Sequence, residues 1–186
     1  IRDRDTTAAQ IATAPRIKID TPKLSGSIST YGGRIDDLSL KTYRETLAVD
    51  SPEVTLLAPV GTQTPYYAVF GWANGAGLDP ADVPSATTEW QITGSSTLTP
   101  DTPVTLQWQN TKGLTFTRTI AVDADYMFTI TDDVKNAGTS DANISKYGIV
   151  ARHGLPKDLV GIYVVHEGLI RRTDGIYHEA NYDEFA

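Results

Sequence analysis

The stretch that most constrains the fold is residues 114–150, which alternates apolar and polar side chains over three successive segments. Its apolar positions are Leu114, Phe116 and Ile120, then Tyr126, Phe128 and Ile130, then Ile144, Tyr147 and Ile149. A period of two places alternate side chains on one face of a strand. Turn-forming residues at 123–125 and 136–138 separate the segments. We therefore predict three consecutive antiparallel strands at the centre of a sheet with one buried face.

The rest of the chain is typical of short strands separated by turns. Ten Pro and fifteen Gly in 186 residues favour this arrangement over long helices, and the length suffices for one large domain or two small ones, with a substantial core. Further strands are expected at 16–19, 23–30, 54–58, 66–72, 89–93, 104–109, 160–166 and 169–173. The predicted fold is all-β, with two twisted antiparallel sheets packed as a sandwich.

Two local signals lie early in the chain. Gly32 and Gly33 separate two alternating runs, and glycine tolerates the positive φ of a tight hairpin turn. Beyond them the apolar parity breaks at Asp36 and Asp37, which predicts a β-bulge with solvated carboxylates. A catalytic or metal-binding carboxylate pair is the alternative, but adjacent strand residues point to opposite faces unless the strand is kinked.

Charge and cysteine content exclude several classes of function. The net charge of −7 and the isoelectric point near 4.8 disfavour binding to nucleic acid, because acidic surfaces repel phosphate backbones. No apolar run approaches the roughly 18 residues of a membrane-spanning helix. The absence of Cys excludes thiolate metal sites and disulfides, and it fits the cytosol and a bacterial periplasm equally well.

The chain offers little catalytic chemistry. Its three histidines, His153, His166 and His178, lack the spacing of a metal-binding helix. Glu167 and Glu179 each follow a histidine, so a His–Glu acid–base pair assembled across strands is an open alternative. No phosphate-binding loop or nucleophile elbow is present. We expect no enzymatic activity, no metal and no cofactor.

Aromatic residues supply a candidate groove. The strand containing Tyr66, Tyr67 and Trp72 precedes residues 73–86, a stretch rich in Gly, Pro and Asp. We expect this strand and loop to form the rim of a groove for an extended, weakly specific ligand such as an unfolded peptide. The alternatives are a variable loop without function and, for the three tryptophans, either a sugar-stacking surface or packing between the sheets.

The segment from Leu155 to Phe185 is the candidate partner surface, because its apolar and aromatic residues do not alternate cleanly with polar ones. Tyr and Arg are enriched at the energetic centres of interfaces. The predicted contact residues are Tyr163, Arg171, Arg172, Tyr177 and Tyr182. Alternatively, these side chains pack on a further part of the same domain.

Several motifs in order resemble the large periplasmic domain of bacterial YidC membrane protein insertases. They are Tyr31-Gly-Gly-Arg-Ile, Gly113-Leu-Thr-Phe-Thr-Arg-Thr-Ile, Asp125-Tyr-Met-Phe-Thr-Ile, Val134-Lys-Asn-Ala-Gly and Glu167-Gly-Leu-Ile-Arg. Each motif is common by itself, but the ordered set covers most of residues 16–183.

The resemblance implies a β-supersandwich similar to that of galactose mutarotases, spanning residues 16–186 after a linker at 1–15 and incomplete at its C-terminal side. It implies a non-catalytic domain on the periplasmic side of the inner membrane, with no membrane span in this chain. The implied partners are SecDF, the Sec translocon and nascent membrane protein segments. A carbohydrate-binding or aldose-epimerase-like protein is the alternative, and an adhesin-type sandwich module is a third, which the order of the motifs disfavours.

Overall fold

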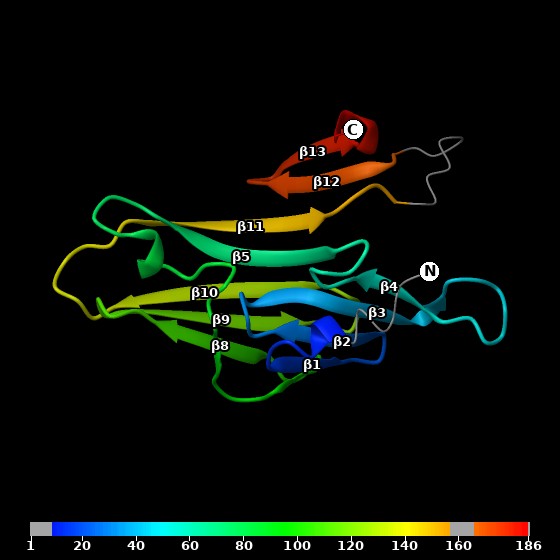
Figure 1. Cartoon of the computed structure of the whole chain (residues 1–186), viewed down its shortest axis with the longest axis horizontal. Coiled ribbons are helices and arrows are strands. Elements are labelled where there is room, and N and C mark those ends of the chain that lie inside the picture. Colours follow the sequence, from blue (N-terminus) through cyan, green and yellow to red (C-terminus); the bar gives the residue numbers. More distant parts are fainter. Residues whose placement is uncertain (1–8, 157–165, 186) are drawn as a thin grey trace. The chain divides into compact units, whose positions relative to one another are not determined.

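The computed structural model describes residues 9–156 and 166–185, and the regular secondary structure of these residues is almost entirely β-strand. The chain divides into two compact units, Ile1–Arg152 and His153–Ala186. The prediction of an all-β fold built from antiparallel sheets is confirmed. Figure 1 shows the strands in sequence colours, from β1 in blue to β13 in red.

The first unit contains two sheets. The seven-stranded sheet consists of β1 (Arg16–Asp20), β2 (Leu24–Ser29), β3 (Arg34–Arg44), β4 (Glu53–Leu57), β5 (Tyr66–Asn74), β7 (Thr97–Leu98) and β11 (Ile144–Arg152). The four-stranded sheet consists of β6 (Gln91–Ile92), β8 (Val104–Gln109), β9 (Leu114–Val122) and β10 (Phe128–Asn136). All pairings are antiparallel except that of β1 with β7. A short 3-10 helix, η1 (Pro80–Asp82), lies in the loop after β5.

The two sheets share one hydrophobic core. Alternate residues of β1 and β2 face inward from the first sheet, and every second residue of β9 faces inward from the second. The ring centroids of Trp72 on β5 and Phe116 on β9 are 4.9 Å apart, so side chains of the two sheets are in direct contact. This is the packing of a β-sandwich, and it is the reason why the strands show a period of two.

The predicted three-stranded meander is confirmed for its first two strands only. β9 and β10 pair over nine residues, from Leu114 opposite Asn136 to Val122 opposite Phe128. β11 instead crosses to the other sheet and pairs with β5 over nine residues. Asn136 turns the chain away from β10, since its side-chain oxygen accepts from the Gly138 amide and its Nδ2 donates to the Ser140 carbonyl. The prediction of a continuous meander was wrong because this turn begins a crossover rather than a hairpin.

The double-glycine hairpin is confirmed. Gly32 and Gly33 have φ of 76° and 61° and connect β2 to β3. A Cβ on Gly32 would lie 2.4 Å from the Ala86 carbonyl oxygen, so both the backbone angle and the space require glycine here.

The predicted bulge is also confirmed, but not its solvation. Ser27 pairs with Asp37 and Ile28 with Ile35, which leaves Asp36 as the extra residue of β3. Asp36 is only 3% exposed, and its carboxylate pairs with Arg16. The expectation of a solvated carboxylate was wrong because the bulge turns this side chain toward the arginine of β1.

The second unit contains a hairpin of β12 (Gly168–Thr173) and β13 (Ile176–Asn181), followed by η2 (Tyr182–Phe185). β12 was expected, whereas β13 was not. Asp174 and Gly175 connect the strands with φ of 51° and 84°, the signature of a type I′ turn. Of the strand expected at 160–166, residues 160–165 lie outside the described part of the chain.

Arg118 joins the two sheets inside the core. It lies on the inward row of β9 and is fully buried. Its Nε donates to Asp132 Oδ1 on β10 at 2.7 Å, and its Nη1 donates to the Phe70 carbonyl on β5 at 2.8 Å. The guanidinium carbon also lies 4.9 Å from the Trp72 ring centroid and 5.2 Å from that of Trp90. These contacts compensate the burial of a charge that would otherwise be strongly unfavourable.

Replacing Gly32 by Ala should destabilise the fold more than replacing Gly77, which has a similar φ of 86° but no atom within 4 Å of an added Cβ. Both variants should lose about 1–2 kcal/mol of unfolding free energy because an L-residue is strained in the left-handed region. Gly32→Ala should lose about 1–3 kcal/mol more, since its methyl group must displace the Ala86 carbonyl. Urea denaturation of both variants measures the difference, and equal losses would contradict the tight approach.

Replacing Arg118 by Met should lower the unfolding free energy by about 3–5 kcal/mol, because Asp132 then loses its buried partner. Lys146→Met is the matched control. Its Nζ lies 2.8 Å from the other oxygen of Asp132, but its side chain is 47% exposed, so a loss below about 1 kcal/mol is expected. Adding Asp132→Leu to Arg118→Met should recover part of the stability in the same denaturation measurement. No recovery would show that the aromatic and carbonyl contacts dominate.

Candidate functional site

A cavity of about 660 Å³ opens where the beginnings of β1 and β3 meet the end of β2. Its walls come from residues 10, 13–16, 29–31, 34, 36, 59–60 and 89–92. Residues 9–11 form one helical turn, and the Gln10 side chain packs against Gly61. Residues 10 and 13–15, in the stretch that the sequence assigned to a linker, therefore form one wall of the cavity.

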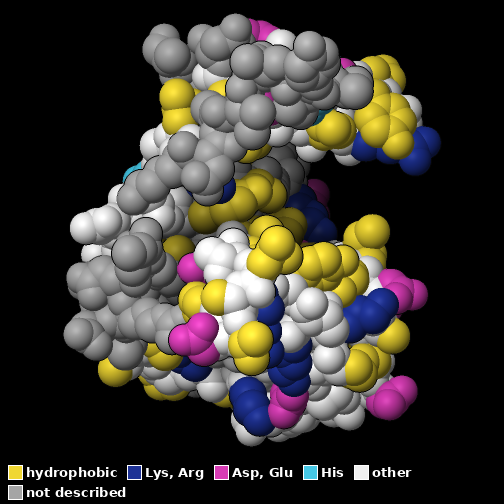
Figure 2. Space-filling model, turned by 90° about the vertical axis from the view of Figure 1, so that its right-hand side faces the viewer, with side chains coloured by type: hydrophobic (Ala, Val, Ile, Leu, Met, Phe, Trp, Pro, Cys, Tyr) yellow, Lys and Arg dark blue, Asp and Glu magenta, His cyan; other side chains and the backbone are white. Residues whose placement is uncertain are grey.

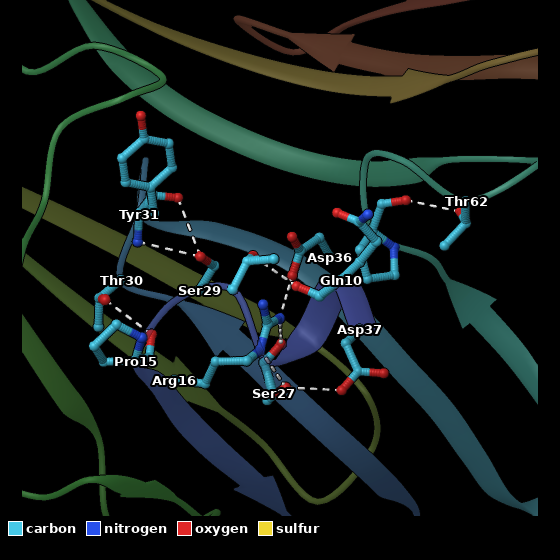
Figure 3. Close-up of polar contacts among 12 residues, drawn as sticks. Gln10, Pro15, Arg16, Ser27, Ser29, Thr30, Tyr31, Asp36, Asp37 and Thr62 are labelled. Carbon is cyan, nitrogen blue, oxygen red and sulfur yellow. Dashed lines mark hydrogen bonds and ion pairs between the residues drawn. The ribbon is translucent and has the colours of Figure 1, made fainter. Parts of the chain in front are cut away.

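An ordered polar network includes two residues of the cavity lining, Arg16 and Asp36 (Figure 3). Arg16 Nε donates to Ser27 Oγ at 2.7 Å, and Arg16 Nη2 pairs with the Asp36 carboxylate. Ser27 Oγ in turn donates to Asp37 Oδ2 at 2.7 Å. The bulge therefore connects both adjacent carboxylates to Arg16. Asp36 pairs with the arginine directly, and Asp37 is linked to it through the hydroxyl of Ser27.

Hydrogen bonds also fix the edge of the cavity. Thr30 Oγ1 donates to the Pro15 carbonyl at 2.8 Å, and the Tyr31 amide donates to Ser29 Oγ at 3.1 Å (Figure 3). Tyr31 itself is 36% exposed. The end of β2 is thus held against the chain entering β1, and the phenol ring stays accessible to solvent.

Burial raises the pKa of Asp36, and the Arg16 guanidinium opposes this rise. The neighbouring Asp37 carboxylate raises the pKa of Asp36 further, although more weakly. The pKa of Asp20, at the other end of β1, is shifted in the opposite direction. Hydrogen bonds from Lys18 and then Lys41 lower its pKa to about 2.

Two buried N–H donors, on residues that contribute to the cavity lining, have no hydrogen-bond partner among the described residues. They are the Nε of Arg34, which opens β3, and the Nε1 of Trp90, which precedes β6. Both atoms are buried, and Trp90 is 4% exposed. Buried donors of this kind are uncommon in folded proteins and are usually bonded. The sequence had assigned Trp90 only to a groove or a core, and nothing in its pattern singled out Arg34.

The predicted groove rim does not gather around this cavity. Trp72 is 5% exposed and packs in the core, where its ring centroid lies 5.9 Å from that of Trp90. Tyr66 is half-buried, and the Arg152 guanidinium lies 5.3 Å from its ring centroid. Tyr67 is also half-buried, but it lies on the face of β5 opposite to that of Tyr66 and Trp72. The sequence left open whether the tryptophans stack on a sugar or pack between the sheets, and in the structure Trp72 and Trp90 pack in the core.

Of the predicted partner residues, Arg171, Arg172 and Tyr177 lie on the hairpin of the second unit and Tyr182 begins η2 directly after it, whereas Tyr163 is outside the described residues. Arg172 and Tyr177 are cross-strand neighbours, and the Arg172 guanidinium lies 5.5 Å from the Tyr177 ring centroid. Arg171 pairs with His178 in the same hairpin and is exposed. Tyr182 is half-buried, and its amide donates to the Glu167 carbonyl at 3.0 Å.

This hairpin exposes apolar side chains on both faces. Tyr177 is 65% exposed and Ile170 60% exposed on one face, and Ile176 is 63% exposed on the other. A two-stranded hairpin is marginally stable by itself, and exposed apolar surfaces of this kind are typical of interaction sites. On the face drawn in Figure 2, apolar side chains are interspersed with charged ones.

The histidines do not assemble a catalytic centre in the described residues. His153 follows β11, His166 precedes β12, and His178 lies on β13 opposite Arg171. Within residues 9–156 and 166–185, no three His, Asp or Glu side chains cluster as metal ligands would. The same ranges include no helix that is long and apolar enough to cross a bilayer.

Together, these features define the class: an all-β sandwich domain with a polar cavity at the strand ends of one sheet and an exposed hairpin of apolar, aromatic and basic residues. The model of the YidC periplasmic domain family matches residues 16–186, so the chain belongs to that family. The resemblance seen in the sequence motifs is thereby confirmed.

Curated relatives carry the name membrane protein insertase YidC. The chain is 50% identical to the Roseobacter denitrificans protein over 97% of its own length and 30% of that protein. It is 51% identical to the Dinoroseobacter shibae protein, over 96% of this chain and 29% of the relative. It is 55% identical to a Ruegeria protein, over 87% and 26% respectively. The chain thus spans about three tenths of the length of these relatives.

We predict that Asp36 and Asp20 titrate on opposite sides of the ordinary aspartate value of 3.8. In a carboxyl ¹³C NMR titration, the Asp36 midpoint should lie above 3.8 and the Asp20 midpoint near 2. Arg16→Gln should raise the Asp36 midpoint further because it removes the opposing positive charge, and it should leave Asp20 unchanged. A lower Asp36 midpoint in Arg16→Gln would show that Arg16 does not oppose the rise in the pKa of Asp36.

The sign of the linked stability change follows from the Asp36 shift. Because the folded state holds this proton to a higher pH than the unfolded state does, the contribution of Asp36 to stability decreases as pH rises from 3.8 through its folded pKa. The contribution of Asp20 is opposite, since it is present above 3.8 and is lost as pH falls toward 2.

Proposed function

We propose that this chain is a non-catalytic domain on the periplasmic side of the bacterial inner membrane, part of a YidC-type insertase. Its role is to assist the insertion and folding of membrane proteins by contacting SecDF, the Sec translocon and nascent membrane protein segments. Family membership over residues 16–186 is the observation that carries the proposal. The carbohydrate-binding or epimerase alternative loses its support, since the named relatives are insertases.

Three observations support a contact role rather than chemistry. The polar network that includes Arg16 and Asp36 is joined in ion pairs and hydrogen bonds within the fold. The three histidines lie on separate segments. The hairpin β12–β13 presents exposed Tyr, Arg and Ile side chains, which are among the residue types that dominate interface energetics when a partner covers them.

We assign the SecDF contact to this hairpin. The cross-strand pair Arg172–Tyr177 offers a ring and a guanidinium on one face, and Arg171 lies on the other. Either face can bury an apolar surface while its arginine pairs with an acidic group of the partner. The remaining alternative is that the hairpin packs on a further part of the insertase's own domain.

The test is co-purification of SecDF with the full-length insertase that carries this domain. The triple variant Arg171→Ala, Tyr177→Ala, Tyr182→Ala should reduce SecDF recovery while leaving the melting temperature of the domain nearly unchanged. A matched control is Tyr43→Ala with Arg44→Ala, which removes an exposed tyrosine and an exposed arginine from β3. That control should retain SecDF.

Two results would reject the assignment. Unchanged recovery of SecDF would exclude the hairpin as the contact. A loss of stability as large as the roughly 2–4 kcal/mol of a core truncation would show that the hairpin packs within the domain.

A further inference from the structure

The loop between β3 and β4, residues 45–52, has an apolar apex. Leu47 and Val49 are the most exposed large apolar side chains in the part of the chain that the structure describes, at 106% and 104%, and Ala48 between them is exposed as well. Figure 1 shows this loop projecting beyond the ends of the strands. Single exposed apolar side chains are common on protein surfaces, but three consecutive ones at the tip of a projecting loop indicate a contact surface.

Hydrogen bonds within the loop hold this apex in one conformation. The Thr46 amide donates to Ser51 Oγ at 2.8 Å, and Ser51 is only 6% exposed. The Ser51 amide donates to the Ala48 carbonyl at 3.0 Å, and the Glu45 amide donates to the Pro52 carbonyl at 3.0 Å. Because these amides are bonded within the loop, the apex enters a less polar environment without losing their hydrogen bonds.

The end of the sandwich beside this loop exposes further large side chains. Tyr43, one residue before the end of β3, is 55% exposed, and Met127, between β9 and β10, is 66% exposed. The hydroxyl oxygens of Thr42 and Tyr126 lie 3.3 Å apart, so these two segments are in contact. Tyrosine is enriched at membrane–water interfaces, and methionine adapts to irregular apolar surfaces.

Charge and shape indicate what covers the apex. Glu45 and Asp50 flank the apolar residues and are exposed. At the base of the loop, Arg44 Nη1 lies 3.8 Å from Glu53 Oε1. Residues 44–53 therefore hold one basic and three acidic side chains, which repel an anionic surface and attract ammonium groups. A convex apex needs a matching pocket in a protein partner, whereas a fluid bilayer conforms to it.

We propose that Leu47 and Val49 insert into the interface of a zwitterionic bilayer whose lipid headgroups carry primary ammonium groups. Glu45 and Asp50 then meet those ammonium groups. Burial of two aliphatic side chains gives a weak, reversible contact, which suffices for a protein already held at the membrane because its local concentration there is high. The preferred lipid class rests on the loop alone, and the presence of a bilayer nearby rests on the proposed function.

The experiment labels the loop with a fluorophore whose emission reports the polarity around it. Since the chain has no Cys, Ala48→Cys places one label at the apex. Thr139→Cys places it in the exposed loop after β10, at the opposite end of that strand from Met127. Each chain is held by an N-terminal histidine tag on vesicles of phosphatidylethanolamine and phosphatidylcholine that contain a nickel-chelating lipid. The emission should shift to the blue in Ala48→Cys and stay unchanged in Thr139→Cys.

Adding Leu47→Ser and Val49→Ser should abolish this shift and leave the melting temperature unchanged, because both side chains are exposed. The matched control is Ile170→Ser with Ile176→Ser, which removes two exposed apolar side chains from the hairpin of the second unit and should retain the shift.

Replacing phosphatidylethanolamine by phosphatidylglycerol should reduce the shift, and Glu45→Gln with Asp50→Asn should remove this difference between the two lipids. A larger shift on phosphatidylglycerol would overturn the assignment to ammonium headgroups. An equal shift in Thr139→Cys, or an equal loss in the isoleucine control, would overturn the assignment to this loop. No shift on either kind of vesicle would overturn the bilayer contact and favour a protein pocket as the partner of the apex. None of these measurements involves SecDF, so this proposal and the proposed function can fail separately.

Discussion

The buried guanidinium of Arg118 is the interaction on which the two-sheet arrangement depends. It occupies the middle of the inward row of β9, between Phe116 and Ile120, where an unpaired charge would be prohibitively unfavourable. Its guanidinium donates hydrogen bonds to Asp132 on β10 of the four-stranded sheet and to the Phe70 carbonyl on β5 of the seven-stranded sheet, and so connects the two sheets. Such a network constrains the relative position of the two sheets, because a shift of either sheet breaks buried hydrogen bonds that water cannot replace.

The same region links the core to the candidate site. The double-glycine turn brings Gly33 close to both Arg118 and Trp90, so that a Cβ there would lie 3.3 Å from the Nη1 of the first and the Nε1 of the second. Trp90 packs on Trp72 and also lines the cavity, while the next residue of the chain after the turn is Arg34. The turn that begins β3 thus sets the position of core and cavity residues at once.

The functional conclusion divides between the two units. The cavity belongs to the sandwich of the first unit, where a bulge and a tight turn hold its polar groups in place. The apolar and basic hairpin belongs to the second unit, where both strand faces are open. The first unit thus offers a preorganised cavity, and the second unit offers an exposed hairpin.

The sequence alone determined the strands, the double-glycine hairpin, the bulge at Asp36 and the family, because each depends on local alternation, turn chemistry or motif order. The Asp174-Gly175 turn carried an equally local signal for β13, which was overlooked. Only the tertiary structure decided which strands pair, and in it β11 pairs with β5 rather than with β10. It also decided the burial of Asp36 and the partners of Arg118. These depend on side chains 14 to 48 residues apart in sequence meeting in space, and no period or local spacing encodes such contacts.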